Sequence, residues 1–450
     1  MNLDARRAGV LLHPTSLPSG SLADVERWLD FLHAAGFGVW QMLPLGIPLA
    51  GLSPYQCASA FAVNPRLFPA APVDVTGFAA WRGRQAHWLV DFSRFMVLRA
   101  LHGNAAWTAW PAPLRDREPS ALAAFDAAHA DALRAVQVEQ YRAAMAWQRI
   151  RAQAAVRGIR LFGDMPIFVA HDSADVWAHR DLFLLDAAGQ PTVVAGVPPD
   201  YFSETGQRWG NPHYDWAAMQ ADGFRWWRQR LAAHVEWFDL VRIDHFRGLA
   251  AAWAIPADEP TAVNGRWVEA PGDALLQAIA DDLGALPLVA EDLGIITPEV
   301  TALRHRFGLP GMAVLQFAFD HHADNPHKPE NVRPDTVYYT GTHDNDTTRG
   351  WWESLPEAAR VQVMTQLGVD APDAVPGVMI DTVLASAAAL AILPLQDVLG
   401  LGSEARMNTP GTVEGNWTWR FAWRDLPEGL ACRMLDKLKQ TQRCESLFPS

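Results

Sequence analysis

The chain has 450 residues, half of them hydrophobic and 19% charged, which is the composition of a globular protein with a large core. Its net charge of −13 argues against nucleic acid or an anionic membrane surface as the main partner. The sequence has no apolar span of membrane length, no secretory signal pattern and only 3 scattered cysteines, which predicts a soluble cytoplasmic protein.

Short apolar segments recur along the chain, and several of them end in polar or charged residues. The segments are apolar on both faces, as parallel strands buried on both sides are. They comprise residues 8–16, 38–46, 159–167, 240–246, 287–294, 313–319, 336–344 and 390–399. Their pattern predicts eight parallel strands.

Helical patterns lie between most of these segments, and only the connection after the sixth strand looks short of helix. Ser21 fits the cap position before the first helix, and Gly36 is expected to end it. The predicted helices are residues 24–36, 140–158, 224–238, 273–284 and one that opens at Thr297-Pro298. Strands alternating with helices in this way predict a (β/α)8 TIM barrel, a fold of the α/β class.

Two intervals are too long for simple connections between strands. Residues 47–139 follow the second strand, and residues 168–223 follow the third. Both are expected to be insertions at the C-terminal face of the barrel, where barrel enzymes build their substrate sites. The sequence therefore predicts one catalytic domain, residues 1–450, with two insertion subdomains.

Acidic residues stand at the predicted C-terminal ends of four strands. The third strand ends at Asp164, the fourth at Asp244, the fifth at Glu291-Asp292 and the seventh at His343-Asp344. The strand ends of a barrel point into one mouth, so these side chains are expected to meet in space. A single carboxylate there could simply cap the following helix, but acids on four strands favour a functional site.

Converging carboxylates serve either metal binding or acid–base and nucleophilic chemistry. A metal site would use Asp164, His245, His343 and Asp344. These residues lack the paired-histidine spacing of common zinc sites, and His13 on the first strand stands alone. Arg242 also argues against a metal, because a fixed cation two residues before Asp244 on the same strand face would oppose a second cation. The sequence therefore predicts neither a metal nor a cofactor.

The surroundings of Asp244 and Glu291 differ in a way that suits a catalytic pair. Arg242 favours an ionised and poorly basic carboxylate at Asp244, as a nucleophile that must also leave requires. Glu291 lies in the apolar run LVAEDL, which predicts a raised pKa and the role of proton donor. Such a pair fits retaining glycoside chemistry, with the carboxyl groups roughly 5–5.5 Å apart. The 20 tryptophans, against 6 tyrosines, supply flat apolar faces that suit stacking on sugar rings.

Long motifs occur in series along the chain. They are LPLG (43–46), SPYQCASAFAVNP (53–65), GDMPIFVAHDSADVW (163–177), PPDYFSETGQRWGNPHYDW (198–216), VRIDHFRG (241–248), AEDLG (290–294) and YTGTHDNDTTRGWW (339–352). With these motifs the sequence resembles the amylomaltase (4-alpha-glucanotransferase) family, a branch of the alpha-amylase clan. The resemblance implies a retaining barrel enzyme without the clan's C-terminal β-domain. The glycine-rich segment that usually follows SLPSG in the family is missing.

The resemblance also implies roles for individual residues. Asp244 matches the nucleophile, Glu291 the general acid/base and Asp344, rather than Asp346, the transition-state stabiliser. The positions that match the cleavage subsite are Tyr55, Asp164, Arg242 and His343. Residues 198–211 resemble a flexible flap over bound glucan, with Tyr201, Phe202, Gln207, Trp209 and Asn211. His245 and Arg247 either contact sugar or position the neighbouring loops.

The implied activity is 4-alpha-glucanotransfer, in which α-1,4-glucan segments move between maltodextrins through a covalent glycosyl-enzyme. The expected partners are maltooligosaccharides, amylose and, as a further candidate, glycogen, and the chain is expected to act as a monomer. Three alternatives stay open: an α-glucan hydrolase on the same site, a glycan-binding protein without catalytic activity and, as the most distant, a metal-dependent hydrolase that EDTA would inactivate.

Overall fold

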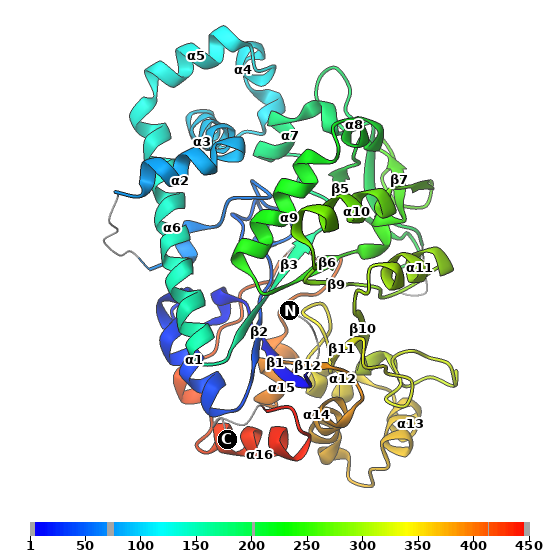
Figure 1. Ribbon diagram of the computed structural model, residues 1–450. Helices are drawn as coiled ribbons and strands as arrows, with labels where there is room; N and C mark the ends of the chain where they lie inside the picture. Colours follow the sequence, from blue (N-terminus) through cyan, green and yellow to red (C-terminus); the bar gives the residue numbers. More distant parts are fainter. Residues whose placement is uncertain (1–4, 70–75, 200–202, 413, 445–450) are drawn as a thin grey trace.

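The computed structural model describes residues 5–69, 76–199, 203–412 and 414–444, and its centre is a barrel of eight parallel strands (Figure 1). In the order of their hydrogen bonding these are β10 (Gly311–Val314), β11 (Thr336–Tyr339), β12 (Leu390–Pro394), β1 (Arg7–Leu11), β2 (Val39–Gln41), β3 (Arg160–Pro166), β6 (Leu240–Asp244) and β9 (Leu288–Ala290). Between β9 and β10 the Ala290 N–H donates to the Pro310 carbonyl oxygen at 2.9 Å. The predicted TIM-barrel fold is therefore confirmed.

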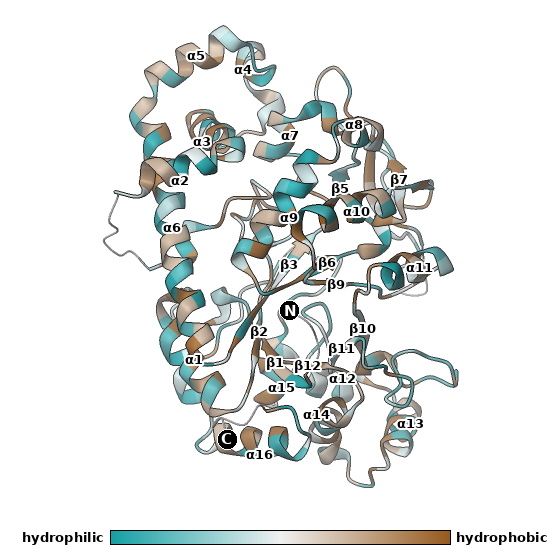
Figure 2. Cartoon of the chain, viewed as in Figure 1, coloured by the Kyte–Doolittle hydropathy of each residue, from teal (hydrophilic) through white to brown (hydrophobic). Residues whose placement is uncertain are grey.

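The strands are buried on both faces, as their apolar sequences predicted. Alternate side chains from the strands form one cluster inside the barrel, which includes Leu11, Val39, Phe162, Leu240, Val289, Val314, Val337 and Ile392. The intervening residues belong to a larger core between the strands and the helices, as Val10 and Trp40 do. In Figure 2 the ribbon of β9 is coloured as hydrophobic, whereas α13 (Glu357–Leu367) mixes both kinds of residue. The fold thus has an inner and an outer core.

The predicted helices are present around the barrel. They are α1 (Val25–Ala34), α6 (Ala130–Val156), α9 (Arg225–Trp237), α10 (Gly272–Leu283) and α11 (Pro298–Arg306). Gly36, at a φ of 80°, follows the end of α1, and the Ser21 hydroxyl accepts the Ala23 N–H at the short 3-10 helix that precedes α1. Between β10 and β11 the fully described residues 315–335 contain a 3-10 helix, Leu315–Phe317, and no α-helix. This agrees with the prediction for the sixth connection.

The two long intervals fold into helices and strands of their own. Between β2 and β3 the chain forms the lobe at the upper left of Figure 1, which contains α2 (Phe78–Arg84), α3 (Ala86–Leu101), α4 (Ala112–Arg115), α5 (Pro119–Ala128) and the start of α6. Between β3 and β6 it forms α7 (Ala174–Ala178), β4 (Val193–Val197), β5 (Gln207–Pro212), α8 (Trp216–Ala221) and α9. Asp164 and Asp244 thus lie on neighbouring barrel strands although a long segment separates them in sequence.

A second, antiparallel sheet has the strand order β5-β4-β7-β8, with β7 at Ala251–Pro256 and β8 at Arg266–Glu269. The sequence analysis did not predict it. Its local signal is weak, because β8 is only four residues long and β7 pairs with β4, which is distant in sequence. The sheet matters for function, since β7 begins shortly after Asp244 and β5 carries part of the predicted flap.

The remaining helices follow β11 and β12. They are α12 (Thr348–Ser354), α13, α14 (Val375–Ala385), α15 (Leu395–Val398) and α16 (Leu430–Gln440). Over the part of the chain that the structure describes, no helix has both the length and the apolar character that crossing a membrane requires.

Arg443 fastens the end of α16 to the bottom of the barrel. Its guanidinium is 1% exposed and donates to the backbone carbonyls of Leu384, Ser386, Ala388 and Arg7. These bonds join the chain end to residues beside β1 and β12.

Replacing Arg443 by methionine is expected to lower the free energy of unfolding by about 3 kcal/mol, because buried carbonyl oxygens lose their donors. Urea unfolding followed by circular dichroism measures the change as a lower midpoint. Arg433→Met on the exposed face of α16 is the matched control and should change the stability by no more than about 0.5 kcal/mol. Equal midpoints for both variants would contradict this role of Arg443.

Candidate active site

Arg242 joins two acids at the mouth of the barrel. The backbone register of β3 and β6 sets Asp164 beside Arg242, and alternation along β6 places Arg242 and Asp244 on one face. Nη1 of Arg242 lies 2.9 and 2.7 Å from the two carboxylate oxygens of Asp164, and Nη2 lies 2.8 Å from Oδ1 of Asp244. Asp164 is buried, whereas the side chain of Asp244 is 30% exposed. Asp244 is therefore paired with the Arg242 guanidinium and is still accessible to a substrate.

The position of Asp164 depends on a close contact between β3 and the end of α9. Gly163 lies where the Phe238 ring packs against the strand, and a Cβ atom there would come within 2.3 Å of that ring. Burial raises the pKa of the Asp164 carboxyl, and Arg242 opposes this shift. Burial alone would lower the pKa of Arg242, but Asp164 and Asp244 outweigh it and raise that pKa well above its ordinary value. Arg242 thus stays a cation in the catalytic pH range.

Tyr55 and His343 complete the wall of the site next to Asp164. The Tyr55 hydroxyl donates to Oδ2 of Asp164 at 2.7 Å and lies 2.9 Å from Nε2 of His343. The two rings stack with centroids 5.2 Å apart, and the Trp417 ring lies 6.2 Å from that of Tyr55. Trp417 was not singled out from the sequence, since it lies far along the chain from both partners. Together these rings offer flat apolar surface beside the carboxylates.

Glu291 follows directly after β9 and lies next to the segment that carries Asp244. One of its carboxyl oxygens accepts the N–H of His245 at 2.7 Å, and the other accepts the N–H of Leu293 at 3.0 Å. Burial raises the pKa of Glu291 to about 7 and Asp244 adds to this rise, whereas Arg242 and the two N–H donors oppose it. The raised pKa predicted from the apolar run around Glu291 is therefore present. Near neutral pH this carboxyl group can hold a proton and release it.

Asp344 follows β11 and directly succeeds His343, with 48% of its side chain exposed. Its Oδ1 accepts a hydrogen bond from Nδ2 of Asn408 at 2.6 Å and lies 3.5 Å from Nε2 of His343. Asp346 is differently occupied, because it accepts from the Ser403 hydroxyl at 2.7 Å and from the Thr347 N–H at 2.8 Å. These contacts support Asp344, rather than Asp346, as the acid that faces the substrate. Asn408 is a second residue that the sequence analysis missed.

A pair of substitutions tests this choice. Asp344→Asn is expected to reduce kcat about 10³-fold, because a carboxylate aimed at a developing positive charge is lost. Asp346→Asn should reduce kcat by no more than about tenfold, since the amide oxygen can still accept from the Thr347 N–H and the amide nitrogen can donate to the Ser403 hydroxyl, which acts as donor or acceptor. Steady-state kinetics with maltotriose measures both. Similar losses in the two variants would contradict the assignment.

The predicted flap residues that the structure describes lie close to the segment that contains Asp244 and His245. Oε1 of Gln207 accepts from the Trp209 indole at 3.1 Å, and Oδ1 of Asn211 accepts from Nε2 of Gln56 at 2.9 Å. The Trp209 ring meets the His245 ring edge-on, with centroids 4.8 Å apart. Residues of β5 thus contact both Gln56, which follows Tyr55, and His245, which follows Asp244. The predicted flap residues Tyr201 and Phe202 lie outside the described residues.

His245 has an unusual backbone and a neutral side chain. Its φ of 55° places it in the left-handed region, and its Nε2 is buried without a hydrogen-bond partner. Burial lowers its pKa to about 4, so the imidazole is uncharged at neutral pH. Arg247, two residues on, stacks on Trp267 of β8 with its guanidinium carbon 3.8 Å from the ring centroid.

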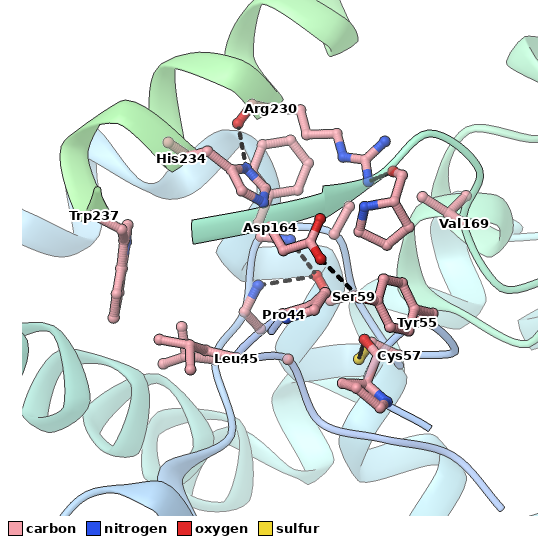
Figure 3. A pocket seen from close by; sticks show the side chains of 18 of the residues that line it. Pro44, Leu45, Tyr55, Cys57, Ser59, Asp164, Val169, Arg230, His234 and Trp237 are labelled. Atoms are coloured by element: carbon pink, nitrogen blue, oxygen red, sulfur yellow. Dashed lines mark hydrogen bonds between the residues drawn. The ribbon is translucent and has the colours of Figure 1, made fainter. Parts of the chain in front are cut away.

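A cavity of about 70 Å³ lies behind the wall formed by Asp164 and Tyr55 (Figure 3). Its lining is mostly apolar and comes from residues 44–63, from β3 and the residues after it, and from α9. None of Asp244, Glu291 and Asp344 lines it. The cavity therefore adjoins the site at Asp164 and Tyr55, but the three predicted catalytic acids do not line it.

Two of the four residues considered for a metal site, Asp164 and His343, contact other side chains. Asp164 pairs with Arg242 and Tyr55, and His343 lies against Tyr55. Within the described ranges, no group of three or more His, Cys, Asp or Glu side chains is arranged to hold a metal ion. The site instead combines an acid beside a cation with an acid that holds a proton, which is the arrangement that retaining glycoside chemistry uses.

Comparisons with known proteins agree with this chemistry. A family described as 4-alpha-glucanotransferase matches residues 11–75 and 69–425. A 4-alpha-glucanotransferase of Thermus thermophilus is 46% identical, over 97% of this chain and 99% of the relative, and one of Synechocystis is 44% identical over 93% and 94%. The solved structure of an amylomaltase from Streptococcus agalactiae in complex with acarbose superposes with a TM-score of 0.93 at 32% identity, over 98% of this chain and 100% of that one.

Proposed function

We propose that this chain, which belongs to the 4-alpha-glucanotransferase family, transfers α-1,4-glucan segments between maltodextrin donors and acceptors with Asp244 as nucleophile and Glu291 as general acid/base. The observation that carries the assignment of roles is the contrast between the two acids. Asp244 is half-buried and paired with Arg242, whereas Glu291, also half-buried, has a pKa raised to about 7, mainly by desolvation. One group is equipped to attack and the other to donate a proton.

In the first step the Asp244 carboxylate attacks the anomeric carbon of the donor. Glu291 gives its proton to the glycosidic oxygen, the C–O bond breaks, and the reducing-end fragment leaves as an alcohol. The product is a β-linked glycosyl ester of Asp244. Asp344 is exposed beside His343, and its negative charge stabilises the oxocarbenium-like transition state.

In the second step Glu291 acts as a base. Formation of the ester removes the negative charge of Asp244, which was one of the causes that raised the pKa of Glu291, while Arg242 and two N–H donors continue to lower it. Glu291 is therefore better held as a carboxylate in the intermediate than in the free enzyme. It takes the proton from the 4-hydroxyl of an acceptor, whose oxygen attacks the anomeric carbon. The ester bond to Asp244 breaks, the Asp244 carboxylate leaves, and an α-linkage forms again.

Transfer requires that sugar, rather than water, reaches the intermediate. The Trp209 ring meets the His245 ring edge-on, and the Trp417 ring packs beside that of Tyr55. These rings supply apolar surface that binds sugar rings and leaves water poorly placed. Maltooligosaccharides, amylose and glycogen are the proposed substrates. In support, the amylomaltase of Streptococcus agalactiae was solved with acarbose.

Incubation with maltotriose tests the proposal. Free glucose together with maltotetraose and longer products indicates transfer, whereas maltose and glucose alone would indicate an α-glucan hydrolase. Chromatography of the products at early times separates these outcomes. A complete lack of turnover, with maltotriose binding retained, would instead favour a glycan-binding protein.

Three predictions from the sequence complete the proposal. We infer that the chain is a single catalytic domain, that residues 47–139 and 168–223 are insertions into it, and that the second of these carries the flap. A cytoplasmic location is proposed from the composition and the small number of cysteines. The monomeric state is tested by light scattering, with a single species of the chain's own mass expected.

A further inference from the structure

Trp267 exposes a large part of its ring on the edge strand of the second sheet. It lies in β8, at the end of the strand order β5-β4-β7-β8, and is 39% exposed. Arg247, which stacks on Trp267, also bonds to the backbone of Ile295, and Ile295 is 67% exposed. Among the tryptophans that the structure describes, Trp267 is the only exposed one, and the others are buried or half-buried.

The ring of Trp267 is held in place by its neighbours. The Arg247 guanidinium carbon lies 3.8 Å from the ring centroid, and the ring of Trp253, its partner across the strands, lies 5.2 Å away at an angle of 64°. Trp253 is itself fixed, because its indole N–H donates to the Ala262 carbonyl oxygen at 2.9 Å. Because the Trp267 side chain is already ordered, it loses little conformational entropy when a ligand binds to it.

The same arginine connects Trp267 to both catalytic segments. Arg247 follows Asp244 by three positions, and it donates a hydrogen bond to the carbonyl oxygen of Ile295, which follows Glu291 by four. In Figure 1 the ends of β6 and β9 lead toward α11 and β7 on the right of the barrel. Trp267 is thus on the rim of the mouth, on the side of Glu291.

The position on the Glu291 side identifies the part of the substrate that would reach Trp267. Glu291 protonates the leaving oxygen, so the departing chain, and later the acceptor, extend along that side of the mouth. Tyr55, Asp164 and His343 form the cluster that Arg242 joins to Asp244, and the transferred sugar is expected to bind against that cluster.

We propose that Trp267, supported by Arg247, is a stacking platform for a distal glucosyl ring of the departing and accepting glucan chains. The C–H face of a glucose ring matches the flat indole, and a neutral sugar is not repelled by the acidic surface of the protein. The inference rests on the proposed function. It adds a binding position that long glucans reach and the shortest substrates do not.

Kinetics of Trp267→Ala with maltotriose and with maltoheptaose test the platform. The apparent KM for maltoheptaose should rise about tenfold, which corresponds to the loss of one ring contact, while kcat and the KM for maltotriose stay within about twofold of the wild type. Trp267→Phe keeps a flat face and should lie close to the wild type. Leu101→Ala, which truncates another exposed apolar side chain on α3, is the control and should change neither KM.

The outcomes separate the platform from the function on which it rests. If the wild-type enzyme forms no products longer than maltotriose from maltotriose, the proposed function fails. If the wild type does so and Trp267→Ala has an unchanged KM for maltoheptaose, the platform is refuted. An equal loss with both sugars, together with a lower melting temperature, would show that Trp267 is structural and would refute the platform as well.

Discussion

Replacing Asp244 by asparagine is expected to lower the rate of transfer from maltotriose by about 10⁴-fold or more, because an amide can neither form nor release the glycosyl ester. The fold should persist, since Arg242 keeps its two bonds to Asp164 and the asparagine oxygen can still accept from Arg242. The measurement is the rate of glucose release, with circular dichroism to check the fold. Activity within about tenfold of the wild type would remove Asp244 from the mechanism.

Azide distinguishes a lost nucleophile from a general loss of activity. In Asp244→Ala, azide can enter the space of the carboxylate and attack α-maltotriosyl fluoride, with fluoride as the leaving group. The new C–N bond then has the β configuration, because the attack comes from the face that Asp244 used. Nuclear magnetic resonance of the anomeric proton identifies the product, and an α-azide from this variant would contradict the proposed position of the nucleophile.

The activity should fall on the alkaline side as Glu291 loses its proton. The acid is active in its protonated form, and burial raises its pKa to about 7, so the proton is held below that pH and lost above it. The value of kcat/KM for maltotriose is therefore expected to fall about tenfold for each pH unit above about 7. Glu291→Gln should lower kcat about 10³-fold and remove this alkaline decline.

A donor that needs no proton provides the control for this prediction. Fluoride leaves without acid assistance, so the first step with α-maltotriosyl fluoride should be insensitive to pH near 7 in the wild type and nearly intact in Glu291→Gln. An alkaline decline that persists with the fluoride donor would assign the pKa to another group.

The barrel and its strand-end acids could be predicted because local sequence determines both. Segments such as LAILP in β12 are apolar on both faces, which identifies a buried parallel strand, and barrel geometry predicts that acids near the strand ends, such as Asp244 in β6, meet at one mouth. The apolar run around Glu291 likewise indicated its raised pKa correctly. In these cases the physical cause lies within a few residues of the effect.

The rest of the site depends on contacts between distant segments. Asn408 bonds to Asp344, and Trp417 packs beside Tyr55, although neither stands at a strand end or in a periodic pattern. The second sheet was missed for the same reason, because β7 pairs with β4 across a long sequence separation. The stack of Arg247 on Trp267 depends in turn on that sheet.

The central claim is that Asp244 forms the covalent bond to the transferred sugar. Glu291→Gln incubated with α-maltotriosyl fluoride tests it most directly, since the first step proceeds without an acid and the second lacks its base. The glycosyl-enzyme should accumulate, and peptide mass spectrometry should find one maltotriosyl group on the peptide that contains residues 240–249, attached to Asp244. A maltotriosyl group on any other residue, or release of fluoride with no covalent adduct at any time, would contradict the mechanism.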